Sequence, residues 1–474
     1  MRHTPKIGVH GVFVCYNILV LLLSSFHEST SSSSHCKAWL VQSIPTDMPH
    51  LSHVPGTLST GDVLRWLAAN STTRLHIIAQ YWQLLPSPND PRSGDYGYTQ
   101  HQMHEFGADQ GVSLYQALDA AADRNVSIRL LSHSGVYPTF ASEPSKLAFG
   151  RPNVENVTLL LEDWWGSGIV HAKVWISDSR DVYIGSANND WKSLTQTSVI
   201  CQPMILVSLL STSLLSPLPQ YLETPHIAGY PILSEPYMFK VPFQTPGSNY
   251  STKHPQGSYL SFAPPELLFG KYQADEHAWI DTIKSVGKKE TVRISTMDWL
   301  GQSEFIDQTI YWSSLSSATS QVVFSKNATV QILVAYWSHS ISNTDSYLNS
   351  LLYTNNLCSS SKYNTCSGKV EIKYYVVPGF NMTGPAIKGG NRTGNIYPDF
   401  TRVNHGKYAV SDVRAHIGTS NLVWDYFYTT AGVSLGTHNT AIISQLREIF
   451  NADWNSPYAV PFEEMENVHT RSSI

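Results

Sequence analysis

The sequence is poor in charged residues and has no surplus of basic ones. Asp, Glu, Lys and Arg make up only 14% of its 474 residues, and the formal net charge is -5. A protein that holds nucleic acid on a broad basic surface carries a clear positive balance. The composition therefore excludes that class but leaves room for a small cationic cleft. The apolar share of 42%, with 13 Trp and 25 Tyr, also excludes a disordered chain and predicts a substantial folded core.

Cysteine is scarce as well, with five residues in the whole chain. No Cys-x-x-Cys pair and no Cys/His cluster has the spacing of a zinc site, so we expect no metal and no cofactor. Cys15 lies in an apolar N-terminal segment, and the even number that remains suits two disulfides in an oxidising compartment. The stretch CSSSKYNTC, residues 358–366, is a plausible local loop closure, which leaves the other two cysteines as a second pair. The disulfide candidates are Cys36, Cys201, Cys358 and Cys366.

One N-terminal stretch is long and apolar enough to concern a membrane. Residues 7–26 contain no charged side chain, and a spanning helix needs roughly 20 apolar residues. The core of the stretch, 11–23, also has the length of the apolar region of a signal peptide, so a cleaved signal and a retained anchor are both open. Arg2 and Lys6 before it favour a cytoplasmic N-terminus and an exported body. We therefore expect a single-pass type II protein of the endomembrane lumen, or a secreted protein if the segment is cleaved.

Sequences of the type Asn-x-Ser/Thr agree with export. One match is close to noise, but seven matches, all beyond the apolar segment, indicate a lumenal glycoprotein. The predicted glycosylation sites are Asn70, Asn125, Asn156, Asn249, Asn327, Asn381 and Asn391.

The chain repeats itself. HAKVWISD at 171–178 returns as HGKYAVSD at 405–412, and YIGSAN at 183–188 returns as HIGTSN at 416–421. Three apolar, strand-like segments precede each copy in the same order. These pairs are 74–82 with 292–300, 125–134 with 328–340, and 156–164 with 369–377. Short apolar runs recur by chance in α/β proteins, but matched segments in one order make coincidence a weak explanation.

Helical periodicity alternates with these strands. Residues 111–125 carry an apolar face before a strand, and residues 439–454 form a last amphipathic helix. This alternation of strands and helices predicts an α/β fold of two pseudo-symmetric halves, each a mixed β-sheet flanked by helices. The two halves are expected to share one active site. We expect an N-terminal segment at 1–35, a first half at 36–196, a divergent connector at 197–256, a second half at 257–460 and a tail at 461–474.

The repeated motif has the chemistry of a phosphodiester site. Alternate side chains of a strand share a face, so each His should point the same way as the Lys two residues later. One imidazole could attack phosphorus while the other protonates the leaving oxygen, and lysines and amides could hold the remaining phosphate oxygens. The predicted catalytic residues are His171, Lys173, Asn188, His405, Lys407 and Asn421. We expect a supporting or structural role for Asp178, Asp412, Ser186 and Thr419.

At these residues the sequence resembles the phospholipase D superfamily, and more closely its lumenal, lysosomal branch. The resemblance also rests on NDWKSLTQ at 189–196, RVNH at 402–405, DYFYTTAG at 425–432 and DWNSPYA at 453–459. It implies a signal anchor, a route from the endoplasmic reticulum to the lysosome, and 5′ exonuclease action on single-stranded DNA or RNA. It also implies an alternative, transphosphatidylation of lipids to bis(monoacylglycero)phosphate, and allows a homodimer. By analogy His171 is the nucleophile, through a covalent phosphohistidine, and His405 the acid/base.

One departure from the family lies after the first Gly-Ser-x-Asn. The family often places an acidic residue there to orient the catalytic His, and that position falls at Val199 in the first half and at Thr429 in the second. The whole stretch 197–219 is apolar and rich in Ser, Leu and Pro. Divergence, an error in the gene structure and a catalytically weakened membrane glycoprotein are all open, and we expect weakened catalysis if His171 lacks its carboxylate.

Overall fold

The computed structural model describes residues 37–133, 143–162, 167–205, 241–242, 257–265, 273–360, 365–380 and 397–465. The apolar N-terminal segment, Cys36 and the Asn-x-Ser/Thr sites at Asn249, Asn381 and Asn391 lie outside these residues. Within the described ranges no helix has the length and apolar character to cross a bilayer.

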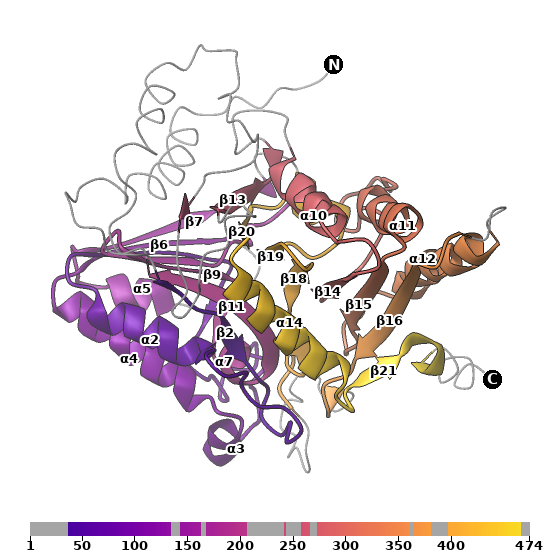
Figure 1. The fold of residues 1–474 in the computed structure, drawn as a ribbon. Coiled ribbons are helices and arrows are strands. Elements are labelled where there is room, and N and C mark those ends of the chain that lie inside the picture. The colour runs from indigo at the N-terminus through magenta and orange to yellow at the C-terminus, as the bar shows by residue number, and fades with distance from the viewer. Residues whose placement is uncertain are drawn as a thin grey trace, which may run out of the picture.

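The first half of the chain builds a mixed sheet (Figure 1). Its strands run in the order β3-β2-β11-β9-β8-β4-β6-β7, with β1 also paired to β11. Neighbours β4, β6 and β7 are parallel, whereas β4–β8, β8–β9 and β9–β11 are antiparallel. The bounds are β1 (Lys37–Ala38), β2 (Val41–Ser43), β3 (Leu58–Ser59), β4 (Arg74–Ala79), β6 (Ser127–His133), β7 (Val154–Leu159), β8 (Val174–Ser177), β9 (Asp181–Gly185) and β11 (Thr197–Ile205). A small parallel pair joins β5 (Trp82–Gln83) to β10 (Asn189–Asp190).

The second half builds another mixed sheet, in the order β12-β13-β20-β19-β18-β14-β15-β16-β21. Again three neighbours, β14, β15 and β16, are parallel, and β18, β19 and β20 follow in antiparallel pairs. The bounds are β12 (Val241–Pro242), β13 (Gly257–Ala263), β14 (Thr291–Thr296), β15 (Thr329–Ala335), β16 (Lys369–Tyr375), β18 (Lys407–Val410), β19 (Ala415–Ile417), β20 (Gly432–Thr437) and β21 (Ala459–Pro461). The short β17 (Val403–Asn404) crosses over and pairs with β11 of the first sheet.

The two sheets match strand for strand. The run β7-β6-β4-β8-β9-β11 of the first corresponds to β16-β15-β14-β18-β19-β20 of the second. The register is equivalent too, because Val174 faces Ile78 and Tyr408, three residues after its own His, faces Ser295. The sequence repeat is therefore a repeat of structure, and the predicted α/β fold of two similar halves is confirmed.

Helices cover the outer faces of the sheets (Figure 1). Helices α2 and α4 pack on the first sheet through a core that includes Leu64, Leu118 and Trp175, and α10, α11 and α12 lie beside the second. The predicted helices at 111–125 and 439–454 are α4 and α14, and the inward face of α14 is buried as expected. The bounds are α2 (Thr60–Asn70), α3 (Gln100–Glu105), α4 (Asp109–Asp123), α5 (Glu143–Ala148), α7 (Trp191–Thr195), α10 (Ala274–Lys284), α11 (Ser314–Lys326), α12 (Thr344–Ser359), α13 (Trp424–Tyr428) and α14 (Thr440–Trp454).

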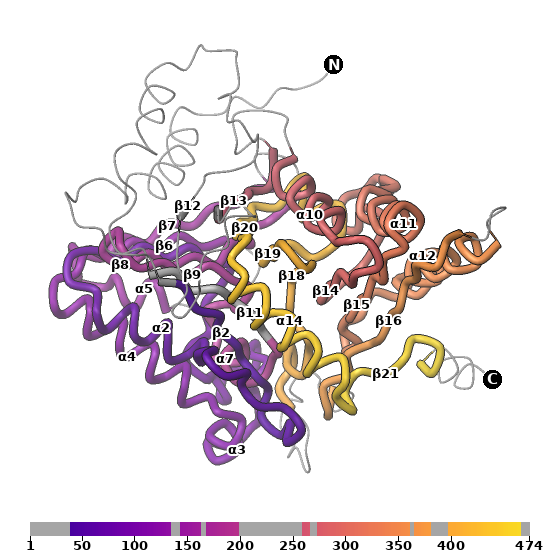
Figure 2. The backbone as a smooth tube through the Cα atoms, viewed as in Figure 1, coloured from indigo at the N-terminus to yellow at the C-terminus, as the bar shows by residue number. Residues whose placement is uncertain are grey.

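The halves share a core. Figure 2 shows the indigo-to-magenta half and the orange-to-yellow half side by side, with α14 in yellow at their junction. One buried cluster joins Val174 and Ile184 of the first sheet to Val410, Ile417 and residues of α14. Burial of apolar surface at this junction stabilises each half against the other. Residues 197–205, the first part of the predicted connector, form β11 within the first sheet.

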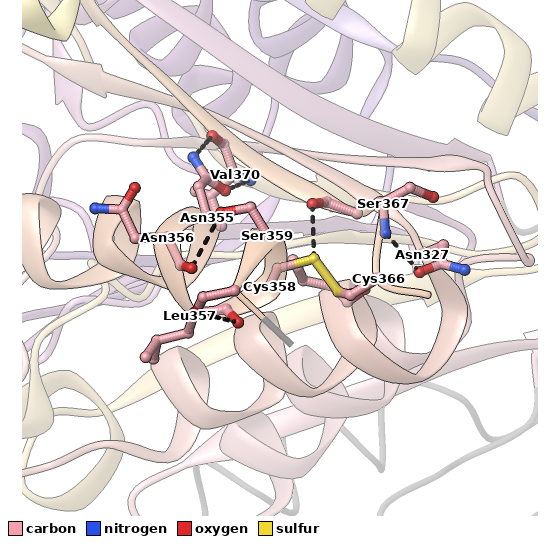
Figure 3. Close-up of a disulfide and its surroundings, with 12 residues drawn as sticks. Asn327, Asn355, Asn356, Leu357, Cys358, Ser359, Cys366, Ser367 and Val370 are labelled. Carbon is pink, nitrogen blue, oxygen red and sulfur yellow. Dashed lines mark hydrogen bonds between the residues drawn. A yellow bond between two sulfur atoms is a disulfide. The ribbon is translucent and has the colours of Figure 1, made fainter. Parts of the chain in front are cut away.

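A disulfide joins Cys358 and Cys366 at the end of α12, and it closes the loop that the sequence indicated (Figure 3). Beside it, the N–H of Ser367 donates to the side chain of Asn327, and Asn355 exchanges two hydrogen bonds with the backbone of Val370. Of the described glycosylation candidates, Asn70 and Asn125 are exposed, whereas Asn156 and Asn327 are half-buried.

Candidate active site

His171 sits in a segment that the second half holds in place. Its backbone N–H donates to the carbonyl of Ala431 at 2.8 Å, and the N–H of Ala431 donates back to Ile169, also at 2.8 Å. Residues 171–173 precede β8 and do not belong to it, so the motif begins just outside the strand in which the sequence placed it. The contact that positions His171 thus comes from the residue just before β20 of the other half.

His405 is held in the same way from the opposite side. It follows β17, whose residues Val403 and Asn404 pair with Thr197 and Ser198 at the start of β11. The N–H of His405 donates to the carbonyl of Ser198 at 2.7 Å. The two histidines therefore have reciprocal backbone supports, as a pseudo-two-fold arrangement requires.

The two lysines are fully buried at the same place. The Nζ of Lys173 donates to the carbonyl of His171 at 2.6 Å and to Gln80 Oε1 at 3.4 Å. The Nζ of Lys407 donates to the carbonyl of His405 at 3.2 Å and lies 3.8 Å from the Sδ of Met297. Each ammonium is thus folded back beside its own histidine.

Electrostatics shows that the half-sites converge. Burial lowers the pKa of His171 well below its usual value, and the charges of Lys173, Lys407 and His405 lower it further. Burial, then Lys407 and Lys173, lower the pKa of His405 in the same way. Each imidazole also meets backbone of the opposite half, Thr419 for His171 and Ser186 for His405, which opposes the lowering of its pKa. Ser186 and Thr419 thus contact the histidines through their backbone.

The two amides lie just beyond the equivalent strands β9 and β19. Asn188 Nδ2 donates to the hydroxyl of Tyr81 at 3.3 Å, and Asn421 Nδ2 donates to Asp298 Oδ2 at 2.5 Å. Both asparagines are buried. The structure therefore brings His171, Lys173, His405 and Lys407 together. Asn188 and Asn421 each lie two residues after the backbone group that meets the histidine of the opposite half.

The two motif aspartates lie elsewhere, in the turns that leave their strands. Asp178 accepts hydrogen bonds from the N–H groups of Thr72, Thr73 and Arg74, which overcome the effect of burial and lower its pKa to about 2. Asp412 accepts from the N–H of Gly287 at 2.9 Å. Each carboxylate ties the turn after its motif to the segment that leads into the neighbouring antiparallel strand, β4 for Asp178 and β14 for Asp412.

The sequence did not predict three residues that lie at the site. Tyr81 and Asp298 follow the matched strands β4 and β14, in QYW and MDW, so the repeat carried a signal for them. Tyr426 on α13 packs edge-on against the His171 ring at 5.0 Å. No spacing in the sequence pointed to Tyr426, because it reaches His171 from the other half.

Comparison with known proteins agrees with this geometry. Residues 98–379 match the family described as PLD3/4, PLD-like domain. The chain is 30% identical to the 5'-3' exonuclease PLD3 of Xenopus laevis, over 91% of this chain and 82% of that protein. It is 24% identical to phospholipase D Y of Dictyostelium discoideum, over 96% and 99%. Among solved structures, phosphatidylserine synthase from Haemophilus influenzae covers 86% of each chain with a TM-score of 0.51 at 12% identity, which supports the fold.

The fold and the doubled His-Lys-Asn site define a phosphodiesterase of the phospholipase D superfamily. Within that superfamily, the chain belongs to the PLD3/4-like family.

Proposed function

We propose that the protein releases nucleotides from the 5′ end of single-stranded nucleic acid, through a covalent phosphohistidine. The observation that carries the mechanism is the convergence of two buried histidines and two buried lysines, one of each from either half. A phosphate oxyanion compensates that concentration of positive charge, and the lysines supply the electrostatic stabilisation, so the reaction needs no metal.

The steps follow from the environments of the histidines. A neutral His171 attacks phosphorus, forms an N–P bond and breaks the P–O bond to the leaving group. The phosphate anion offsets the lysine charges and brings the pKa of His405 back toward its ordinary range, so His405 can carry a proton and give it to the leaving oxygen. His405 then takes a proton from water. The water oxygen forms a bond to phosphorus, the N–P bond breaks, and the nucleotide leaves with its phosphate while His171 returns to its neutral form.

An aromatic path at the site supports a nucleic-acid substrate. Phe305, whose ring is 59% exposed, packs edge-on against Tyr426 at 6.1 Å, and Tyr426 packs against His171. The carboxylate of Asp425 holds the backbone N–H groups of Glu304 and Phe305, which fixes this loop over α13. A terminal base could stack on such a path while its phosphate lies between the histidines. The exonuclease relatives point the same way.

A lipid substrate is the second candidate, because the chain is also similar to a phospholipase D over nearly all of its length. The same site would then transfer a phosphatidyl group to an alcohol, as in the formation of bis(monoacylglycero)phosphate. The histidine chemistry is common to both reactions, so only substrate assays separate them.

The test uses the purified protein with a single-stranded oligonucleotide that bears a 5′-hydroxyl, at mildly acidic pH and with EDTA. We expect stepwise release from the 5′ end by the wild type, none by His405→Ala, and full activity of His101→Ala, whose histidine lies on the exposed surface of α3. Labelled phosphate should be trapped on a histidine. Release of lipid product instead, with no nucleotide release, would replace the exonuclease proposal by the lipid one.

The cellular setting belongs to the same proposal. A lumenal body attached to the membrane by residues 7–26 would carry glycans on the seven sites and reach the lysosome. The exposure of Asn70 and Asn125 supports glycosylation at those two sites. Loss of mass on glycosidase treatment and resistance to alkaline extraction would bear this out, and light scattering would detect the homodimer that the resemblance allows.

A further inference from the structure

The two half-sites differ at one equivalent position. Two residues beyond β4 the first half has Tyr81, and two residues beyond β14 the second half has Asp298. Both side chains accept a hydrogen bond from the asparagine of their half-site. The second half therefore places an ionisable carboxyl directly beside its asparagine. In the first half a hydroxyl takes that place, and it donates in turn to the buried carboxyl of Asp190.

The carboxyl of Asp298 is buried beside the asparagine of its half-site. The residue is 7% exposed, and its Oδ2 lies 2.5 Å from the amide nitrogen of Asn421. The charged and titratable groups that face it are Lys407 on β18, Glu304 in the following loop and Tyr426 on α13. Burial raises the pKa of Asp298 to about 6, while Lys407 acts to lower it and Glu304 to raise it.

A carboxylate at this place competes with the substrate. Asn421 and Lys407 are among the groups proposed to hold phosphate oxygens. Asp298 accepts a hydrogen bond from Asn421, and the charge of Lys407 acts on its carboxyl. Two anions in a buried site repel each other far more strongly than in water. A neutral carboxylic acid keeps its place beside Asn421 without that repulsion.

We propose that Asp298 is a positioning residue that makes phosphate binding in this pocket depend on acid: its protonated form presents Asn421 to the substrate phosphate, and its carboxylate form repels that phosphate. The inference rests on the proposed function for the identity of the substrate, but not for the convergence of two histidines and two lysines at one site. Binding of a phosphodiester then takes up one proton at Asp298, and binding weakens as the pH rises above the range in which Asp298 is protonated.

Sulfate is the first probe, because it is tetrahedral and its charge does not change between about pH 5 and pH 7.5. Calorimetry on the wild type and on Asp298→Asn gives the two affinities at each pH. We expect the dissociation constant of the wild type to rise at least about tenfold more across this range than that of the variant. Asp298→Ser, which removes the charge without adding an amide, should flatten the dependence in the same way.

One control variant keeps this result specific. Asp453→Asn removes a buried carboxyl of raised pKa on α14, where it accepts a hydrogen bond from Tyr375, and its pH dependence should run parallel to that of the wild type. Parallel curves for the wild type and both Asp298 variants would overturn the proposal. So would a folded Asp298→Asn protein that binds no sulfate at any pH.

The second readout is kcat/KM on the 5′-hydroxyl oligonucleotide over the same pH range. Asp298→Asn should retain its activity at least about tenfold better than the wild type when the pH is raised to 7.5. If neither protein acts on the oligonucleotide, the exonuclease proposal fails, and the sulfate measurements still decide the role of Asp298.

Discussion

His171 and Ala431 lie in opposite halves of the chain, and a backbone hydrogen bond of 2.8 Å joins them. The reciprocal bond joins His405 to Ser198 at 2.7 Å. Each half therefore relies on the backbone of the other to hold its histidine in place. The active site is a product of the junction between the halves, and its geometry depends on how closely the two backbones approach.

Gly168→Ala tests that approach. Gly168 has a φ of +90°, and a Cβ there would lie 2.0 Å from the carbonyl oxygen of Thr429 in the other half. We expect the segment that carries His171 to move off the second half, with a loss of about a hundredfold in kcat, because misplacement of a catalytic group by about 1 Å costs that much. Single-turnover kinetics on the folded variant measures it.

Gly150→Ala is the matched control. Gly150 also has a positive φ, +72°, but no atom lies within 4 Å of the position of its Cβ. It should lose about 1 kcal/mol of stability from the backbone conformation and retain its kcat. Equal losses of kcat in both variants would show that positive φ, and not contact between the halves, accounts for the effect.

The sequence predicted those parts of the site that the two repeated motifs supply. Apolar strands recur because both sheets need the same buried ladder, and the polar His, Lys and Asn stand out against it. It could not predict contacts made only through space, such as that of Tyr426 with His171 or of Ser198 with His405. Asp298 belongs to the repeated segment MDW, but only its buried contact with Asn421 indicates a role at the site. The divergent stretch after Gln196 did not signal that its first residues form β11 and support His405.

Phe305→Ala tests the aromatic path to the site. Loss of the exposed ring should raise KM for an oligonucleotide about tenfold and leave kcat nearly unchanged, since stacking of a base on an aromatic ring contributes about 1–3 kcal/mol. Phe324→Ala, at a similarly exposed phenylalanine on α11, is the control and should change neither constant. A KM effect of equal size in the two variants would remove Phe305 from the substrate path.

Val199→Glu tests whether the lack of an acidic residue at this position limits kcat. The backbone of Val199 lies in β11 opposite Ser43, one residue after the carbonyl that supports His405. If an orienting carboxylate is limiting, the variant should show a higher kcat, because such partners are worth about tenfold to a hundredfold at other sites. A folded variant with unchanged or lower kcat would mean that backbone contacts from Thr419 and Ser186 orient the histidines sufficiently.

Asp453→Asn tests how the fold responds to acid. Asp453 is buried on α14 and accepts a hydrogen bond from the hydroxyl of Tyr375, and burial raises its pKa to about 7. A carboxyl whose pKa is higher in the folded than in the unfolded chain stabilises the fold least when it is ionised. Its contribution to the free energy of unfolding therefore falls as the pH rises from about 4 to about 7. An amide carries no such penalty, so the variant should exceed the wild type by about 2 kcal/mol at about pH 8 and match it near pH 4.

Thermal melts of both proteins at the two pH values measure that difference. Asp178→Asn supplies a control of opposite sign, because backbone N–H groups lower the pKa of Asp178 to about 2 and its carboxylate stabilises the fold. That variant should be less stable than the wild type at neutral pH, with the gap closing as the pH falls through about 2. A constant difference between Asp453→Asn and the wild type at all pH values would show that Asp453 stays ionised in the fold. Glu143 would then be the next carboxyl to replace, because it accepts hydrogen bonds from the N–H groups of Leu84 and Leu85 and burial raises its pKa to about 7.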